Sequence, residues 1–262
     1  TLNDKKYELT ANDGPNNLHS GMDFYRNRIW AAEYETGVNQ VSFTLESPDG
    51  DQGYPGALDM RVTYSLDEEN LLTIHYEAVP DKDTVINMTN HSYFNLNGHD
   101  SGSVLGHSVM LDADAFTPAD EESIPTGEIR PVDGTPMDFR TPKQLGAEID
   151  ADYEPLRFGG GYDHNWVLKN ENGFDKVAEV TADKSGIRME VWTDLPGVQM
   201  YTANFLDNEP GKDGAVYGSR SAVCLETQYY PDAVHHDNFP GPICRGGEKY
   251  DTRTAYRFVP CE

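Results

Sequence analysis

The runs MRVTYSLD (residues 60–67) and LTIHYEA (residues 72–78) alternate apolar and polar side chains with a period of two. Because successive side chains of a strand point to opposite faces, this alternation is typical of strands with one buried face. The same pattern recurs in three further runs, VSFTLE (41–46), VAEVTAD (177–183) and IRMEVWTD (187–194). Clusters of Gly, Asp, Asn and Pro between the runs mark turns. The sequence therefore predicts an all-β protein, built as a large antiparallel β-sandwich.

Helical periodicity is weak throughout the chain. The best candidate for a helix is the short segment TPKQLGAEID (141–150). We find no internal repeat, low-complexity segment or Pro/Ser-rich linker, and sandwiches often exceed two hundred residues as one unit. We therefore expect residues 1–262 to form a single β-sandwich domain.

The charge balance restricts the possible partners. The chain carries 45 acidic and 20 basic side chains, for a formal net charge of -25, and it has no Lys/Arg block. A field of this sign repels nucleic acid and anionic lipid. We expect a neutral small molecule as ligand, no nucleic-acid or membrane partner, and a monomer or a dimer.

The cysteines indicate the compartment. Cys224, Cys244 and Cys261 are odd in number and far apart, without a C-x-x-C pair, which argues against both a disulfide framework and a zinc site. No run approaches the roughly eighteen apolar residues of a membrane helix. We expect a cytoplasmic protein, and no metal at the adjacent pair His235 and His236, because neighbouring side chains point apart.

A candidate acid lies in NMTNHSYFNLNG (87–98). If this stretch is extended, His91 shares a polar face with Thr89, Tyr93 and Asn95 and points away from the core. The structural alternative is a histidine that is hydrogen-bonded between strands.

A candidate base lies in AVCLETQYYPD (222–232). On an extended chain Glu226 shares its face with Ala222, Cys224, Gln228 and Tyr230, so that burial would raise its carboxyl pKa toward the range of a general base. The alternative is a glutamate paired with an arginine at a sheet edge.

Three further segments offer groups that suit sugar hydroxyls. GGGYDHNWVL (159–168) places Asp163 and Asn165 on the face opposite its aromatic residues, and LPGVQMYTANF (195–205) presents Gln199. NDGPNNLHSG (12–21) carries His19 in a loop. Each has a plain structural alternative: a turn, an ordinary strand and a solvated loop.

Together these segments resemble the aldose 1-epimerase family, the galactose mutarotases, in type, order and approximate spacing across nearly the whole chain. The resemblance rests on NHSYFNL, GYDHNW, LPGVQMYTANF and CLETQYYPDAVHHDNFP. It implies a galactose mutarotase-like supersandwich that interconverts the α and β anomers of a free hexose, galactose or glucose, without cofactor or metal. It also implies that Glu226 is the general base, that His91 is the general acid, and that Asp163, His19 and Gln199 hold sugar hydroxyls.

The chain departs from the family pattern near its start. Family members begin with additional strands that supply a substrate-binding arginine in an Asn-Arg-Ile-like motif. Arg26 and Arg28 follow the His19 loop and do not occupy that place, and Ser20 stands where relatives commonly have glycine. We therefore expect the sequence to be N-terminally incomplete.

Two other functions remain open from the sequence. A glycoside hydrolase would use two carboxylates, which Glu226 and Asp163 could supply, although the histidine would then have no role. A non-catalytic sugar-binding homologue would bind hexoses without accelerating anomer exchange.

Overall fold

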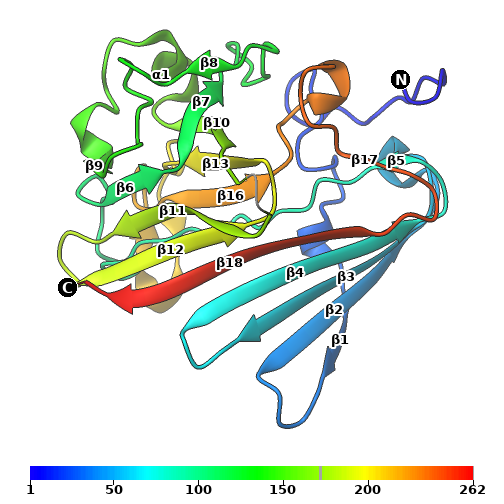
Figure 1. Cartoon of the computed structure of the whole chain (residues 1–262), viewed down its shortest axis with the longest axis horizontal. Helices are drawn as coiled ribbons and strands as arrows, with labels where there is room; N and C mark the ends of the chain where they lie inside the picture. The colour runs from blue at the N-terminus through cyan, green and yellow to red at the C-terminus, as the bar shows by residue number, and fades with distance from the viewer. Residues whose placement is uncertain (171–172, 262) are drawn as a thin grey trace. The chain divides into compact units, whose positions relative to one another are not determined.

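The computed structural model describes residues 1–170 and 173–261, and strands dominate it (Figure 1). By internal contacts the chain groups into two compact units. Unit 1 consists of Thr1–Asp67, Leu72–Asn87 and Pro242–Arg253, and unit 2 of Glu68–Leu71, Met88–Gly241 and Thr254–Glu262. Whether the two units form the single domain that we predicted for residues 1–262 depends on how they are joined, so the single domain stays a prediction.

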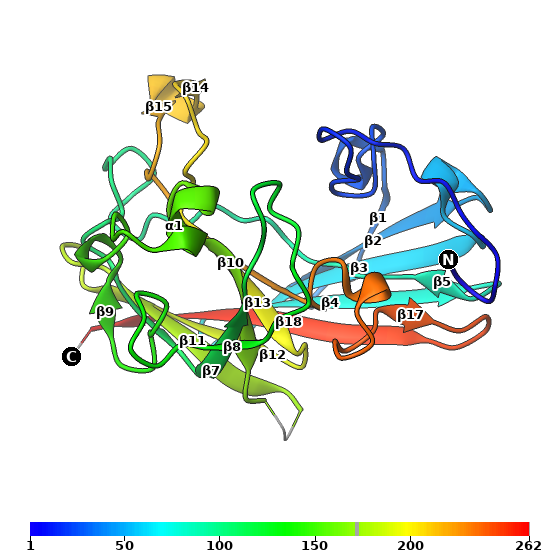
Figure 2. The same ribbon diagram turned by 90° about the horizontal axis from the view of Figure 1, so that it is seen from above.

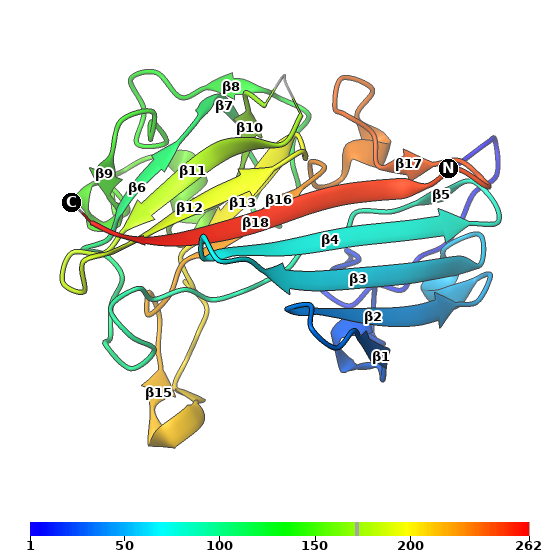
Figure 3. The ribbon, with the colours of Figure 1, turned by 60° about the horizontal axis from the view of Figure 1, so that its bottom comes forward.

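Unit 1 is built on an antiparallel sheet with the order β1-β2-β3-β4, whose long strands lie side by side in Figure 3. A second small sheet pairs β5 with β17, and two 3-10 turns, η1 and η2, accompany them. The bounds are β1 (Ala31–Tyr34), β2 (Gln40–Ser47), β3 (Leu58–Leu66), β4 (Leu71–Pro80), β5 (Thr84–Val85), β17 (Ile243–Cys244), η1 (Tyr25–Asn27) and η2 (Asp51–Gly53).

The described part of unit 2 is built on two large antiparallel sheets, besides the two-stranded sheet of β14 and β15. One has the order β16-β13-β10-β7-β8, and in the other β12, β11, β6 and β9 follow β18, whose residues from Thr254 onward belong to this unit. The bounds are β6 (Ser108–Leu111), β7 (Ala113–Thr117), β8 (Arg130–Pro131), β9 (Lys143–Gln144), β10 (Asp163–Leu168), β11 (Asp175–Thr181), β12 (Ile187–Thr193), β13 (Gly197–Tyr201), β16 (Cys224–Gln228) and β18 (Tyr250–Pro260).

The two large sheets of unit 2 pack face to face. The hydroxyl of Thr227 on β16 hydrogen-bonds that of Thr254 on β18, and the Tyr256 hydroxyl donates to the Leu225 carbonyl at 2.9 Å. Met189 and Val191 on β12 are fully buried, as expected for inward-facing positions of a sandwich. The all-β, antiparallel sandwich predicted from the alternation is confirmed, and the five predicted strands correspond to β2, β3, β4, β11 and β12.

The predicted helix at residues 141–150 is not present, so this prediction was wrong. Residues 141–150 contain only β9 and the 3-10 turn η3 (Leu145–Ala147), because Leu145 is drawn into the core and Gly146 lies against the backbone of Leu105. The α-helix that the structure describes is α1 (Glu154–Gly159), which starts with proline at its first turn. Two further 3-10 turns are η4 (Lys212–Gly214) and η5 (Ala233–His235).

A small hairpin of β14 (Glu209–Pro210) and β15 (Val216–Tyr217) extends from the rest of unit 2, as Figure 2 shows. It leaves β13 through the segment around Phe205 and returns to the chain ahead of β16. The hairpin therefore connects two strands that carry candidate site residues.

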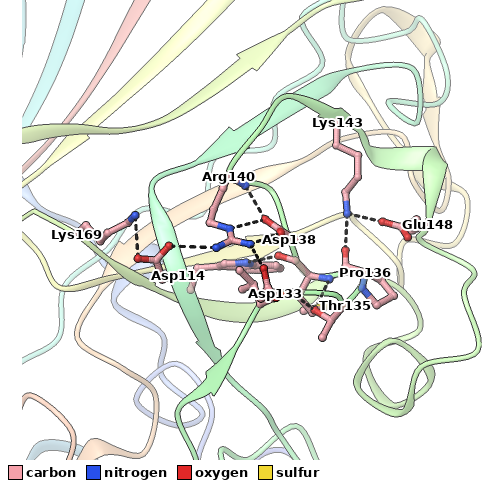
Figure 4. Close-up of polar contacts among 12 residues, drawn as sticks. Asp114, Asp133, Thr135, Pro136, Asp138, Arg140, Lys143, Glu148 and Lys169 are labelled. Carbon is pink, nitrogen blue, oxygen red and sulfur yellow. Dashed lines mark hydrogen bonds and ion pairs between the residues drawn. The ribbon is translucent and has the colours of Figure 1, made fainter.

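An ion-pair network ties the loop of residues 133–148 to β7 and to the end of β10 (Figure 4). Arg140 pairs with Asp133 at 2.8 Å and Asp138 at 2.6 Å, and it also faces Asp114 on β7. Lys169, which follows β10, pairs with the same Asp114 at 3.0 Å. These contacts hold the ends of β7 and β10 together, although exposed pairs individually stabilise a protein by at most about 1 kcal/mol.

The core beneath β10 is aromatic. Trp166 and Tyr162 are fully buried against Phe139 and Phe116, and the Trp166 indole N–H donates to the Met137 carbonyl at 3.0 Å. Aromatic residues bury large areas, so this cluster anchors the strand that carries Asp163.

We expect Trp166→Ala to lower the free energy of unfolding by about 3–5 kcal/mol, because it leaves a large cavity. Trp166→Phe should cost less, since it keeps one aromatic ring in the core, although it loses the second ring and the hydrogen bond to Met137. Urea denaturation followed by circular dichroism measures both values. Equal losses for the two variants would show that ring volume does not dominate.

Candidate active site

The site is built on β16, whose side chains alternate between two faces. The Thr227 side chain faces the opposite sheet, where its hydroxyl hydrogen-bonds that of Thr254, so alternation places Cys224, Glu226 and Gln228 on the other face. Glu226 is only 7% exposed. The predicted placement of Glu226 among Cys224 and Gln228 is confirmed, and its near neighbour is an imidazole instead of an arginine.

The strand register brings the polar residues of β10, β13 and β16 into one row. Gln199 lies opposite Glu226 on one side and opposite Asn165 on the other. The Gln199 amide donates to Asp163 Oδ1 at 2.8 Å, and the Gln228 amide donates to Gln199 Oε1 at 3.4 Å. Gln228 is buried, and Asp163 and Gln199 are half-buried. Their hydrogen bonds hold these polar groups in place and offset the loss of water.

A glycine makes room for this network. A Cβ added to Gly197 on β13 would come within 2.4 Å of Asn165 Oδ1 and 2.9 Å of the Tyr230 ring. No L side chain fits there without moving the Asn165 amide, so Gly197 is required by close approach.

His91 does not lie in a strand, contrary to the expectation from residues 87–98. The segment is irregular, with one bridge between Phe94 and Val223. Side chains fix it instead: the Asn95 amide donates to the Ser221 carbonyl at 3.0 Å, and the Leu96 N–H donates to His107 Nε2 at 3.0 Å. The bridge at Phe94 does not extend into a ladder, because the next N–H groups, of Leu96 and Asn97, donate to the side chains of His107 and Asn95.

His91 and Glu226 nevertheless meet, as predicted. Nε2 of His91 lies 3.5 Å from Oε1 of Glu226, and the two side chains are 32% and 9% exposed. The imidazole therefore has access to solvent while the carboxylate is nearly enclosed. A bound molecule could touch both groups at once.

Two tyrosines flank the imidazole. The Tyr93 ring stacks on His91 with centroids 4.9 Å apart and an interplanar angle of 15°. Tyr201 on β13 meets the same imidazole edge-on at 5.8 Å. We expected Tyr93 on the face of His91 and gave it no role. Tyr201 lies two residues after Gln199 on β13, so alternation along that strand was the available signal for it.

Burial and like charge set the electrostatics of the carboxylates. Burial raises the pKa of Glu226 to about 8, and the charge of Asp163 adds to this shift. Burial also raises the pKa of Asp163 to about 6, while the hydrogen bond from Gln199 opposes the rise. A positive charge on His91 favours the ionised form of Glu226, so the protonation of the two groups is coupled.

The other face of β10 belongs to the core, as predicted. His164 is buried beside Trp166 and Phe116, and burial lowers its pKa to about 4, so that it stays neutral. It therefore has a packing role. Asp163 and Asn165 remain on the side of Gln199.

His19 lies in unit 1, as do Phe24 and Arg26, which contact it. It has a φ of +50°, and its ring meets Phe24 edge-on at 6.2 Å, with Nδ1 3.5 Å from an Arg26 nitrogen. Burial, aided by the Arg26 charge, lowers the pKa of His19. Its expected contact with a sugar hydroxyl stays a prediction.

Two groups of side chains in the described part of the chain have donor atoms within 4.8 Å of one another: His91, Cys224 and Glu226, and His75, Glu77 and Asp251. Burial strongly raises the pKa of the Cys224 thiol, which disfavours the thiolate that zinc binds. In the second group Lys249 already bridges Glu77 and Asp251 at 2.6 and 2.7 Å. We assign a metal to neither.

Among the described residues, no helix has both the length and the apolar character needed to cross a bilayer.

Comparison with known proteins identifies the family. The model of the family described as aldose 1-epimerase matches residues 1–257. The chain belongs to the aldose 1-epimerase family. Mouse galactose mutarotase is 44% identical over 259 residues, which cover 98% of this chain and 73% of the mouse protein. The Escherichia coli K12 aldose 1-epimerase is 37% identical over 262 residues, covering 99% of this chain and 75% of that protein.

A solved structure of an aldose epimerase homologue from C. elegans has the same fold. It superposes with a TM-score of 0.90 at 30% identity and covers 100% of this chain and 78% of the other. The galactose mutarotase-like fold implied by the resemblance is thus confirmed.

Glu226 should lower stability at alkaline pH. The pKa of Glu226 is about 8 in the folded state and 4.5 in the unfolded state. Between these two pH values the folded state binds more protons than the unfolded state, so the contribution of Glu226 to the free energy of unfolding falls as the pH rises. We expect Glu226→Gln to melt several degrees above the parent at pH 9, and the difference to shrink toward pH 4.5.

Differential scanning fluorimetry from pH 4.5 to 9 measures this difference. Glu209→Gln, at an exposed position, is the control and should follow the parent throughout. A parent that is as stable as Glu226→Gln at pH 9 would contradict the raised pKa.

Proposed function

We propose that this chain interconverts the α and β anomers of a free hexose, with Glu226 as the general base and His91 as the general acid. The approach of His91 Nε2 to Glu226 Oε1 at 3.5 Å carries the proposal, because one pyranose can contact both groups there. Family membership supports the reaction class, an isomerisation of sugars at the anomeric carbon.

The mechanism needs two proton transfers. Glu226 in its ionised form removes the proton of the anomeric hydroxyl, and protonated His91 donates a proton to the ring oxygen, so that the bond between C1 and the ring oxygen breaks and an aldehyde forms. Rotation about C1–C2 exposes the other face of the carbonyl. As the ring recloses, His91 takes its proton back from the hydroxyl that attacks C1, and Glu226 returns its proton to the carbonyl oxygen, which becomes the new anomeric hydroxyl.

The environment of the pair suits this chemistry. Burial keeps the Glu226 pKa near the working range of a general base, and the partly exposed His91 can exchange protons with solvent. The pH dependence should be bell-shaped, since one group must be ionised and the other protonated.

Asp163 and Gln199 orient the sugar in the site. Their side chains form one hydrogen-bonded pair beside Glu226 in the register, and together they offer both acceptors and donors to sugar hydroxyls. His19 is proposed as a further hydroxyl ligand on the strength of the family resemblance. Galactose is a proposed substrate, since the mouse relative is named galactose mutarotase, and glucose is proposed on the strength of the family resemblance.

The two other functions are less well supported. A hydrolase would leave His91 without a role, although it lies against Glu226. A sugar-binding homologue would not need a carboxylate with a raised pKa in contact with an imidazole. The proposed cytoplasmic location rests on the three free cysteines, two of them buried.

His91→Asn and Glu226→Gln should each lower kcat by about a hundred- to ten-thousandfold, because each removes one general catalyst. Polarimetry of freshly dissolved α-galactose measures the rate above the spontaneous one. His99→Asn, at a histidine that pairs with Tyr217, is the matched control and should keep the parent rate.

The assignment of the pair fails if either variant equilibrates the anomers as fast as the parent. Sugar binding by a parent protein that does not accelerate exchange would favour the binding homologue. Release of a chromophore from an aryl glycoside would favour the hydrolase.

Asp163→Asn should shift the pH profile of kcat/KM to lower pH. The Asp163 charge raises the pKa of Glu226, so its removal lets Glu226 ionise at lower pH. The maximum of kcat/KM should also fall, because Asp163 is a proposed sugar ligand. A profile that keeps its position would contradict the coupling between the two carboxylates.

A further inference from the structure

The imidazole of His91 is held between aromatic rings. The Tyr93 ring lies almost parallel to it, with an interplanar angle of 15° and centroids 4.9 Å apart. Tyr201 approaches edge-on with an interplanar angle of 88°, and Tyr93 and Tyr201 also contact each other at 6.3 Å. The three rings therefore form one cluster, in which each ring touches the other two.

Tyr201 is the fixed member of this cluster. It is 7% exposed, and its hydroxyl accepts the N–H of Phe205 at 3.1 Å. The Phe205 ring stacks on it with an interplanar angle of 22°. Tyr201 is thus held by backbone and packing, and it limits movement of the imidazole on one side.

Tyr93 is different, because it is 47% exposed and forms no part of a buried core. An exposed tyrosine that is packed against a partly exposed histidine loses side-chain freedom and gains little burial. Such an arrangement suggests that the contact acts on the histidine and not on the stability of the fold.

The stack can act in two ways. A ring lying flat on the imidazole prevents the rotation that would turn Nε2 away from Glu226 Oε1, now 3.5 Å distant. A π face also attracts a cation, so the stack favours the imidazolium over the neutral ring.

We propose that Tyr93 is a positioning residue for His91, whose ring face orients the imidazole toward Glu226 and stabilises its protonated form. This inference rests on the proposed function of His91 as the general acid. Tyr93 acts through the histidine, and no contact with the sugar is required of it.

Other groups also act on the His91 proton and must be kept constant. Glu226 and Cys224 face the imidazole from β16, Tyr201 faces it from β13, and Asp163 on β10 acts through Glu226. The test therefore changes Tyr93 alone and leaves these residues as they are.

The experiment compares Tyr93→Phe, Tyr93→Leu and Tyr93→Ala by saturation-transfer NMR of galactose anomer exchange, from pH 5 to pH 9. Tyr93→Phe keeps the ring face and should stay within about twofold of the parent kcat. Tyr93→Leu and Tyr93→Ala should lose about tenfold in kcat with a smaller change in KM. In both, the alkaline limb should move to lower pH, because the imidazolium has lost the π face.

The matched control is Tyr217→Ala. Tyr217 also packs edge-on against a histidine, His99, but on the β14–β15 hairpin. This variant should keep the parent kcat and pH profile. Melting temperatures of all variants report whether each one is folded.

Three outcomes would overturn the inference. Parent kcat and pH profile in Tyr93→Ala would show that the stack has no role. Equal behaviour of Tyr93→Leu and Tyr93→Phe would assign the effect to volume, and equal loss in Tyr93→Phe and Tyr93→Ala would assign it to the hydroxyl.

The failure of this inference can be told from failure of the proposed function. If the parent protein does not exchange anomers, the proposed function fails. NMR titration of the His91 ring in the parent and in Tyr93→Leu still tests the stack, which predicts that the histidine loses its proton at lower pH in the variant.

Discussion

The site depends on keeping the Glu226 carboxylate out of water while an imidazole contacts it from a partly exposed position. Burial raises the pKa of Glu226, and His91 at 3.5 Å supplies the charge that favours its ionised form. If Glu226 were exposed, it would be a weak base, and if His91 were as deeply buried as His164, it would stay neutral. The different environments of the two groups make a proton exchange possible.

The scaffold makes this arrangement stable by satisfying its polar groups in a row. Gln228, Gln199 and Asp163 hydrogen-bond one another across three neighbouring strands, and Gly197 leaves the space that the Asn165 amide occupies. Beneath them lies the aromatic core around Trp166, which provides the stability that buried carboxylates do not.

His91, the proposed acid, and Glu226, the proposed base, are positioned by different kinds of backbone contact. Glu226 takes its position from a regular ladder, in which its pairing with Gln199 fixes both depth and direction. His91 lies on an irregular segment that is fixed by Asn95, by His107 and by the single bridge at Phe94. The ring of Tyr93 stacks on the imidazole, and His91 itself lies outside the assigned strands.

The amino-acid pattern was enough to predict the all-β class, the strands with clear alternation and the faces of β10 and β16, because a period of two follows from strand geometry alone. Together with the family resemblance it also pointed to Glu226, His91, Asp163 and Gln199. Three features became visible in the folded chain alone: residues 87–93 are not a strand, residues 145–147 form a 3-10 turn, and Tyr93 stacks on His91. Those features depend on contacts between residues that are distant along the chain, such as Phe94 with Val223, and no local pattern encodes such contacts.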